Sequence, residues 1–210
     1  IATLLPGLVR DQSGSARWSR EALLDRLGWS DAIGRRRPHQ FPLGPHVQRN
    51  PATELDLKNA IDAASAGYVS LLGPPGSGKS TLLQLALHST VGRAVARYLA
   101  FVPGGVQGIG RGEAEEFLRD IVQALYGTGL QRRSLHDATT AELAESLESL
   151  LKAAGERFAA SGVKTVIVVD GLDHVPREER PQESFLRVLP LPAAMPDGVV
   201  FVLGSQTLEL

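Results

Sequence analysis

Apolar residues gather in four short runs, which are separated by longer amphipathic stretches. The runs cover residues 68–72, 97–102, 165–170 and 199–204. In the run Thr165-Val166-Ile167-Val168-Val169 every residue is β-branched, which is typical of a strand buried on both faces. Such strands occur in parallel sheets that helices cover on both sides. The pattern therefore predicts an α/β fold built on a parallel sheet.

Helical periodicity fills the stretches between the runs. Asn50 and Pro51 supply an N-cap and a proline at the first helical position, and Thr139-x-x-Glu142 is a capping box. The apolar faces are expected to consist of Leu55, Leu57, Ile61 and Ala64, then of Phe117, Leu118, Ile121, Val122 and Leu125, and finally of Leu143, Leu147, Leu150, Leu151, Ala154 and Phe158.

The first 45 residues differ from the rest in their composition. Ser19 predicts the N-cap of a short helix that Trp18 and Trp29 bracket, and residues 34–45 read as a Pro/Gly-rich linker with three arginines. A solvated linker is the simpler interpretation of that basic run than a nucleic-acid contact. We expect 1–45 to be an N-terminal helical segment and linker that ends an upstream region, because the chain starts at Ile1 and its only methionine is Met195.

Composition excludes several classes of protein. Charged residues make up 21% and the net charge is -1, so no global field favours nucleic acid or an anionic membrane. No cysteine is present, which excludes a disulfide scaffold and fits a reducing compartment. No apolar run approaches the ~20 residues of a membrane span. A cytoplasmic protein without a membrane partner is therefore expected.

The most specific pattern follows the first apolar run, in Gly73-Pro74-Pro75-Gly76-Ser77-Gly78-Lys79-Ser80-Thr81. It matches G-x-x-x-x-G-K-[ST], the phosphate-binding loop, between a predicted strand and a predicted helix. The glycines bring backbone N–H groups close to anionic oxygens, and the helix beginning near Lys79 adds the positive end of its dipole. Lys79 is assigned to the β- and γ-phosphates and Ser80 to Mg²⁺. Residues 73–81 are thus the candidate site for ATP or ADP in a P-loop NTPase.

Two further runs end in polar residues that are expected to face this loop. Asp170 ends the third run and is assigned to Mg²⁺ together with Ser80, and Asp173 is the candidate for orienting or deprotonating the attacking water. Ser205 and Gln206 end the fourth run, where a polar group would sense the γ-phosphate. The five histidines show no metal-ligand spacing, so a site made of protein ligands alone is not expected.

The residues alone leave other functions open. A P-loop kinase for a small metabolite would have the same loop. The large distance in sequence between the loop and Asp170-Gly171-Leu172-Asp173, and the lack of an evident Arg-rich lid, disfavour it. A binding-only module would keep the nucleotide as a structural ligand. A GTPase is disfavoured, since no N-K-x-D element for guanine occurs.

These segments together resemble a STAND-type P-loop ATPase, the group that includes the NACHT ATPases. The resemblance runs over residues 46–210 and lies in 73–80, in Val168-Val169-Asp170-Gly171-Leu172-Asp173 and in Leu203-Gly204-Ser205-Gln206. It implies a nucleotide-controlled switch in a large signalling or antiviral defence protein of the bacterial type. Fused effector and sensor domains and self-association on activation are implied with it. Arg49 stands where the family has an arginine near the base.

The resemblance also implies a topology for this three-layer αβα sandwich. The expected strand order is 5-1-4-3-2, with the fourth run between the first and the third, and with the fifth strand beyond this chain. Two positions depart from the family pattern, because His174 replaces an acidic residue and Gln206 replaces an arginine. Both changes favour slow hydrolysis more than they affect binding.

Overall fold

The computed structural model describes residues 39–101, 112–130, 138–175 and 184–206, all within a unit that begins at His39. The N-terminal helix expected after Ser19, the arginine run and the glycines of 104–110 lie outside these ranges. No helix in the described ranges is long and apolar enough to cross a membrane.

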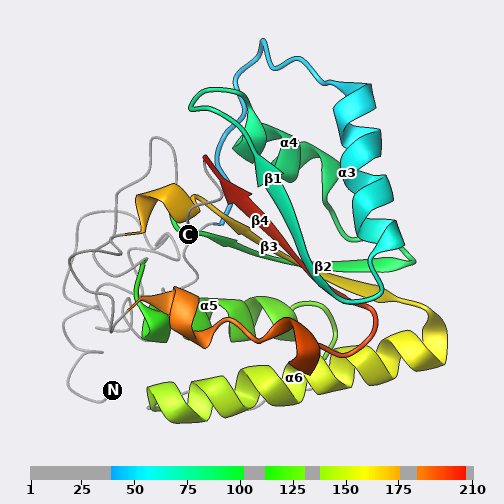
Figure 1. Ribbon diagram of the computed structural model, residues 1–210, viewed down its shortest axis with the longest axis vertical. Helices are drawn as coiled ribbons and strands as arrows, with labels where there is room; N and C mark the ends of the chain where they lie inside the picture. Colours follow the sequence, from blue (N-terminus) through cyan, green and yellow to red (C-terminus); the bar gives the residue numbers. More distant parts are fainter. Residues whose placement is uncertain (1–38, 102–111, 131–137, 176–183, 207–210) are drawn as a thin grey trace, which may run out of the picture. The chain divides into compact units, whose positions relative to one another are not determined.

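Four parallel strands form the sheet (Figure 1). They are β1 (Gly67–Leu72), β2 (Arg93–Leu99), β3 (Lys164–Asp170) and β4 (Val199–Ser205). Their order is β1-β4-β3-β2, so that β4 pairs with β1 on one side and with β3 on the other. The predicted α/β fold with the fourth strand between the first and the third is confirmed. The expected fifth strand stays a prediction.

Helices cover both faces of the sheet (Figure 1). One layer holds α3 (Pro51–Ala63) and α4 (Lys79–Ala86), and the other holds α5 (Ala114–Tyr126) and α6 (Thr140–Ser161). Short 3-10 turns η1 (Leu172–His174), η2 (Phe185–Val188) and η3 (Pro192–Ala194) complete the described elements. The alternation of β4 separates two cores, because Val200 and Val202 pack under α3 and α4 while Phe201 and Leu203 face the other layer.

Local capping explains where two of the helices begin. Asn50 Oδ1 accepts a hydrogen bond from the Thr53 N–H at 3.2 Å, directly before Pro51. Thr139 and Glu142 form both bonds of the capping box that opens α6. The Thr139 N–H and the Thr139 hydroxyl both donate to Glu142 Oε2, and these two bonds lower the pKa of the Glu142 carboxyl. Both predicted helix starts are confirmed.

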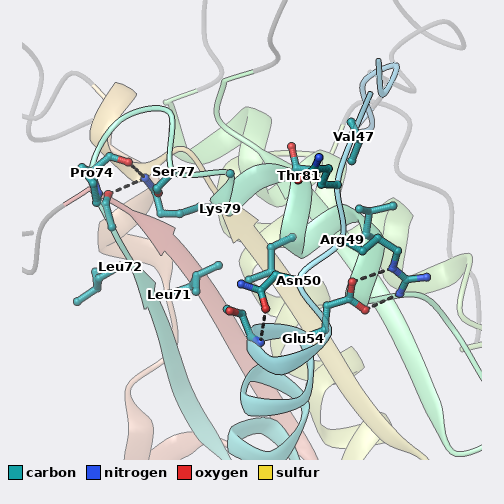
Figure 2. Close-up of a pocket in the computed structure, with 16 residues that line it drawn as sticks. Val47, Arg49, Asn50, Glu54, Leu71, Leu72, Pro74, Ser77, Lys79 and Thr81 are labelled. Carbon is teal, nitrogen blue, oxygen red and sulfur yellow. Dashed lines mark hydrogen bonds and ion pairs between the residues drawn. The ribbon is translucent and has the colours of Figure 1, made fainter. Parts of the chain in front are cut away.

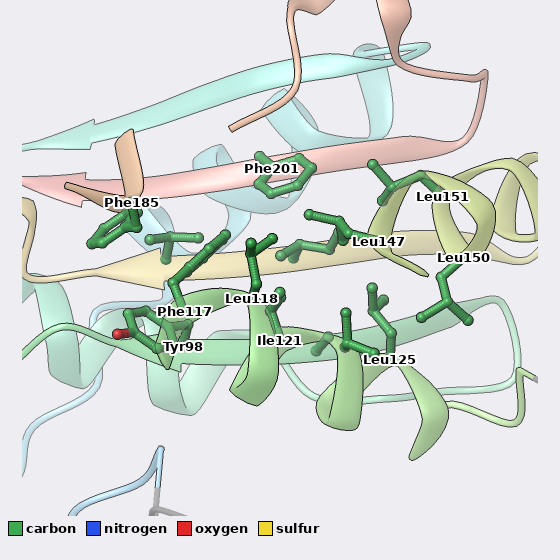
Figure 3. Packing of buried hydrophobic residues seen from close by; sticks show 14 of the residues in the cluster. Tyr98, Phe117, Leu118, Ile121, Leu125, Leu147, Leu150, Leu151, Phe185 and Phe201 are labelled. Carbon is green, nitrogen blue, oxygen red and sulfur yellow. The ribbon is translucent and has the colours of Figure 1, made fainter. Parts of the chain in front are cut away.

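Aromatic rings organise the larger core (Figure 3). Phe117 of α5 stacks on Phe185 of η2 with ring centroids 4.8 Å apart, and Tyr98 of β2 meets the edge of both rings. Such pairs contribute about 0.5–1.5 kcal/mol beyond the area they bury. They fix α5 and η2 against the outer strand β2.

The second strand lies earlier than the sequence pattern predicts, at 93–99 rather than 97–102. Arg93 and Arg97 interrupt the apolar pattern, but the charge of each finds a partner outside the strand. Arg93 Nη2 pairs with Asp62 Oδ1 at 2.9 Å, and Arg97 Nη2 donates to the carbonyls of Leu83 and Leu87 at the end of α4. These distant partners make charged residues compatible with a strand.

Neither α3 nor α4 has a basic residue in its last turn. Basic residues of the sheet cap the C-terminal ends of both helices instead. Arg97 does this for α4. Lys164 Nζ of β3 donates to the carbonyls of Ile61, Asp62 and Ala64 at 2.9, 3.0 and 2.8 Å. A cation at a helix C-terminus satisfies its last carbonyls and offsets the helix dipole.

The apolar face predicted for α3 is wrong at one position. Leu55 is 57% exposed, whereas its neighbour Glu54 is buried. The physical reason is an ion pair of Glu54 with Arg49, which makes burial of the carboxylate tolerable.

Candidate functional site

The loop 73–78 connects β1 to α4 and has the conformation that its glycines permit. Gly76 and Gly78 have φ of 74° and 84°, in the left-handed region where a side chain is strained. A Cβ on Gly73 would lie 2.9 Å from the Ser77 Oγ. The loop therefore needs glycine at 76 and 78 to turn as tightly as it does, and at 73 a side chain would require Ser77 to shift.

Lys79, the first residue of α4, lies over the loop (Figure 2). Its ammonium donates to the carbonyl oxygens of Gly73 at 2.7 Å and Pro74 at 3.0 Å. The side chain is half-buried, and its charge is held by the loop itself. The ammonium lies at the place where anionic oxygens cradled by this loop would reach it.

A cavity of about 480 Å³ adjoins the loop (Figure 2). This volume is in the range of small-molecule sites, roughly 300–1,000 Å³. Its walls come from the segment before α3, the first turn of α3, the end of β1, the loop and α4. The lining residues are Val47, Gln48, Arg49, Asn50, Thr53, Glu54, Leu71, Leu72, Gly73, Pro74, Ser77, Gly78, Lys79, Thr81, Leu82 and Leu85.

Arg49 lies at this cavity and forms a two-pronged ion pair (Figure 2). Its Nε donates to Glu54 Oε1 at 2.8 Å and its Nη2 to Glu54 Oε2. The Arg49 side chain is 58% exposed, whereas that of Glu54 is 7% exposed. The hydrogen bond from Arg49 lowers the pKa of the Glu54 carboxyl. The pair thus fixes the segment before α3 to the first turn of that helix.

Asp170 lies at the end of β3, on the face of the sheet that α4 covers. The residue is 3% exposed, and this burial raises the pKa of its carboxyl. Hydrogen bonds from the Ser80 hydroxyl and the Gly171 N–H lower that pKa in turn. The structure therefore brings Ser80 and Asp170 together, as the sequence predicts.

Gly204 of β4 makes room for that carboxyl. Gly204 pairs with Asp170 in the sheet register, and a Cβ on it would lie 2.1 Å from the Asp170 Oδ1. The side chain of Asp170 thus lies where any other residue at 204 would place its Cβ.

Hydroxyl and carboxylate oxygens are the ligands that Mg²⁺ prefers, and one of each meets here beside the phosphate loop. The residues present therefore fit Mg²⁺. Ser80 and Asp170 are the two that would hold it.

Asp173 and Gln206 meet at the same edge of the sheet. The Gln206 Nε2 donates a hydrogen bond to Asp173 Oδ2, which links the residue after β4 to the turn η1. Ser205 is buried, and by the alternation of β4 it shares the face of Leu203, opposite to Asp170. Within the described ranges its hydroxyl has no hydrogen-bond partner. The geometry therefore brings Gln206, rather than Ser205, to the acidic residues.

A family model for the AAA ATPase domain matches residues 52–202, most of the chain. The chain belongs to this family. It is a P-loop nucleotide-binding domain. No curated protein matches it. Among solved structures, the ORC2 protein of Aeropyrum pernix, in ADPNP-ADP complexes, is similar with 12% identity and a TM-score of 0.45, over 82% of this chain and 45% of that one. The chain thus spans less than half the length of that protein.

Three contributors to the site of this AAA ATPase domain escaped the sequence analysis. Gly204 had a signal, because an isolated glycine in an apolar strand indicates a close approach. Glu54 had a weaker signal, an acidic residue in the first turn of a helix. Gln84 of α4 had none. Its amide accepts from the Phe41 N–H at 3.1 Å and donates to the Phe41 carbonyl at 2.7 Å, across 43 residues of sequence.

Proposed function

We propose that this AAA ATPase domain is an ATP-binding, Mg²⁺-dependent nucleotide switch with slow ATPase activity. One observation carries the proposal, namely the proximity of Ser80, in the first turn of α4, to the buried carboxyl of Asp170 at the end of β3. It connects the loop that would hold phosphates with the acid at the carboxyl end of β3. Ligands of open α/β sheets bind at that edge.

The two ends of ATP are assigned to two neighbouring places. The β- and γ-phosphates take the N–H groups of the loop and the N-terminus of α4, and Lys79 exchanges the carbonyls of Gly73 and Pro74 for phosphate oxygens. The base takes the cavity between residues 47–54 and α4, where Leu82 and Leu85 provide apolar contact. Arg49 lies beside the base in this assignment, in the segment that its ion pair with Glu54 fixes to α3.

Ser80 and Asp170 hold the metal in this assignment, and Mg²⁺, when bound, neutralises charge on the phosphates. Burial raises the pKa of the Asp170 carboxyl because it disfavours the charged form, and a bound cation would favour that charged form.

Asp173 and Gln206 supply the response to the γ-phosphate. Asp173 is assigned to the attacking water and Gln206 to the γ-phosphate, yet the two side chains are hydrogen-bonded to each other. A phosphate oxygen competes with Asp173 for the Gln206 amide, because anionic oxygens are strong acceptors. This competition is a physical basis for a switch that reports the γ-phosphate and for slow turnover.

The place of the module in a larger protein is also part of the proposal. The Asp170-Gly171-Leu172-Asp173 element and its contact with Gln206 support a STAND-type protein of signalling or antiviral defence, with fused effector and sensor domains and self-association on activation. The strand order disfavours the kinase alternative, since β4 separates the loop strand from the Asp170 strand. A binding-only module remains the second candidate, because Gln206 already engages the carboxylate assigned to water.

The test is a calorimetric titration with ATP and ADP, with and without Mg²⁺, on the wild type and on Lys79→Ala. Wild-type binding that depends on Mg²⁺ is expected. The variant should lose triphosphate affinity by at least about thirtyfold and keep its fold, because losing a buried charge-assisted contact costs about 2 kcal/mol or more. Equal ATP affinity in both proteins would refute the assignment of the loop. Phosphate release then separates the switch with slow turnover from the binding-only module.

A further inference from the structure

The wall of the cavity that precedes α3 is anchored outside the cavity as well. This wall comprises residues 41–49, of which Val47, Gln48 and Arg49 line the cavity. It begins two residues after His39, whose Nδ1 accepts from the Leu99 N–H at 3.0 Å while its Nε2 bonds to Asp120 Oδ2 at 3.2 Å. The far end of the wall is held by the ion pair of Arg49 with Glu54.

Gln84 provides the anchor between these two ends. Its side-chain amide makes both hydrogen bonds that a neighbouring strand would make with Phe41, one as acceptor and one as donor. Both residues are half-buried, so the two bonds are partly shielded from water. Most residues from 42 to 49 are exposed, and a turn with a bond from the Val47 N–H to the Gly44 carbonyl precedes the lining residues.

Gln84 itself does not line the cavity, although Thr81, Leu82 and Leu85 of the same helix do. The helix α4 therefore acts at two places. Its N-terminus carries Lys79 and Ser80 of the phosphate loop, and its middle holds the opposite wall through Gln84.

We propose that Gln84 is a positioning residue that fixes the wall 41–49 to the phosphate-loop helix and thereby sets the affinity for the nucleoside part of ATP. This inference rests on the proposed function, ATP binding in this cavity. A wall held in place before binding need not be ordered by the ligand, and preorganisation of this kind raises affinity without a new contact. The affinity for the phosphates, which the loop binds on its own, does not depend on the wall.

The experiment compares full-chain wild type with Gln84→Met, which keeps the length of the side chain and removes both hydrogen bonds. Dissociation constants are measured by calorimetry for MgATP, MgADP and inorganic tripolyphosphate. The variant should bind ATP and ADP about fivefold to tenfold more weakly, the effect of one or two lost hydrogen bonds, and tripolyphosphate unchanged within about twofold. Gln84→Glu keeps the acceptor for the Phe41 N–H but turns an oxygen toward the Phe41 carbonyl, so it should weaken ATP binding as well.

The matched control is Gln123→Met on α5, across the sheet, which should leave all three constants unchanged. An equal loss for tripolyphosphate and for ATP in Gln84→Met would overturn the inference, because the effect would then act through the phosphate loop. Unchanged ATP affinity in both Gln84 variants would overturn it as well. A wild type that binds tripolyphosphate but not ATP contradicts the proposed function itself, and the inference with it, before any variant is compared.

Discussion

Gly204→Ala tests whether the acid at the end of β3 depends on a missing side chain in β4. The added methyl would lie 2.1 Å from Asp170 Oδ1 and 3.0 Å from Leu83 Cδ1. The first distance is far inside the about 3.5 Å at which non-bonded heavy atoms attract each other. Asp170 is 3% exposed, so its carboxyl has little open space to enter.

The expected cost follows from two opposing effects. Overpacking of a buried site costs about 1–3 kcal/mol, and the close contact places this substitution near the upper end. Replacing glycine in a strand by alanine returns about 0.5–1 kcal/mol of backbone entropy. We therefore expect Gly204→Ala to lower the free energy of unfolding by about 2 kcal/mol, or Tm by about 4–8 °C.

Urea denaturation followed by circular dichroism measures this cost in two backgrounds, wild type and Asp170→Ala. In the second background the clashing oxygen is gone, so the same methyl should cost nearly nothing and the coupling energy should be about 2 kcal/mol. Gly92→Ala is the matched control, because a Cβ there meets nothing within 4 Å. The same cost of Gly204→Ala in both backgrounds would show that Asp170 is not what the glycine accommodates.

Two further predictions concern the acids and the capping box. Asp170→Asn should weaken Mg²⁺-dependent ATP affinity about tenfold, because Asp170 acts on the metal, whereas Asp173→Asn should leave affinity unchanged and lower phosphate release, because Asp173 acts on water. Titration with ATP measures the first effect and a phosphate-release assay measures the second. The reverse pattern would exchange the two roles. Thr139→Ala should cost about 1 kcal/mol at neutral pH. Because the pKa of Glu142 is lowered, its contribution to the stability of the fold is present above its usual pKa of 4.5 and is lost as pH falls below that value. The free energy of unfolding of Glu142→Gln should therefore depend less on pH in that range than that of the wild type. Equal pH profiles of the two proteins would contradict this.

Much of the fold and the central part of the candidate site could be predicted from local patterns in the sequence. The phosphate loop, the acid after the third strand and the helix starts at Asn50 and Thr139 are all local, so a short window of residues contains their cause. The order of the strands came from the resemblance of those segments to known ATPases. These features agree with the structure because each one depends on neighbours in the chain.

The features that the sequence did not predict depend on contacts between residues far apart in the chain. The start of the second strand was missed because the charge of Arg93 is satisfied by Asp62 of α3, 31 residues away in sequence. Gln84 meets Phe41 across 43 residues, and no periodicity marks that contact. The ammonium of Lys79 turns onto its own loop, a choice between acceptors that residue types alone do not decide.

The capping of α3 by Lys164 has a consequence for the order in which the domain forms. About a hundred residues separate Lys164 from the carbonyls that it satisfies, so α3 leaves the ribosome long before its cation is synthesised. Contacts of such high sequence separation slow folding, because the loop between them must close first. The helix that borders the cavity therefore gains its C-terminal support only when β3, the strand that bears Asp170, joins the sheet.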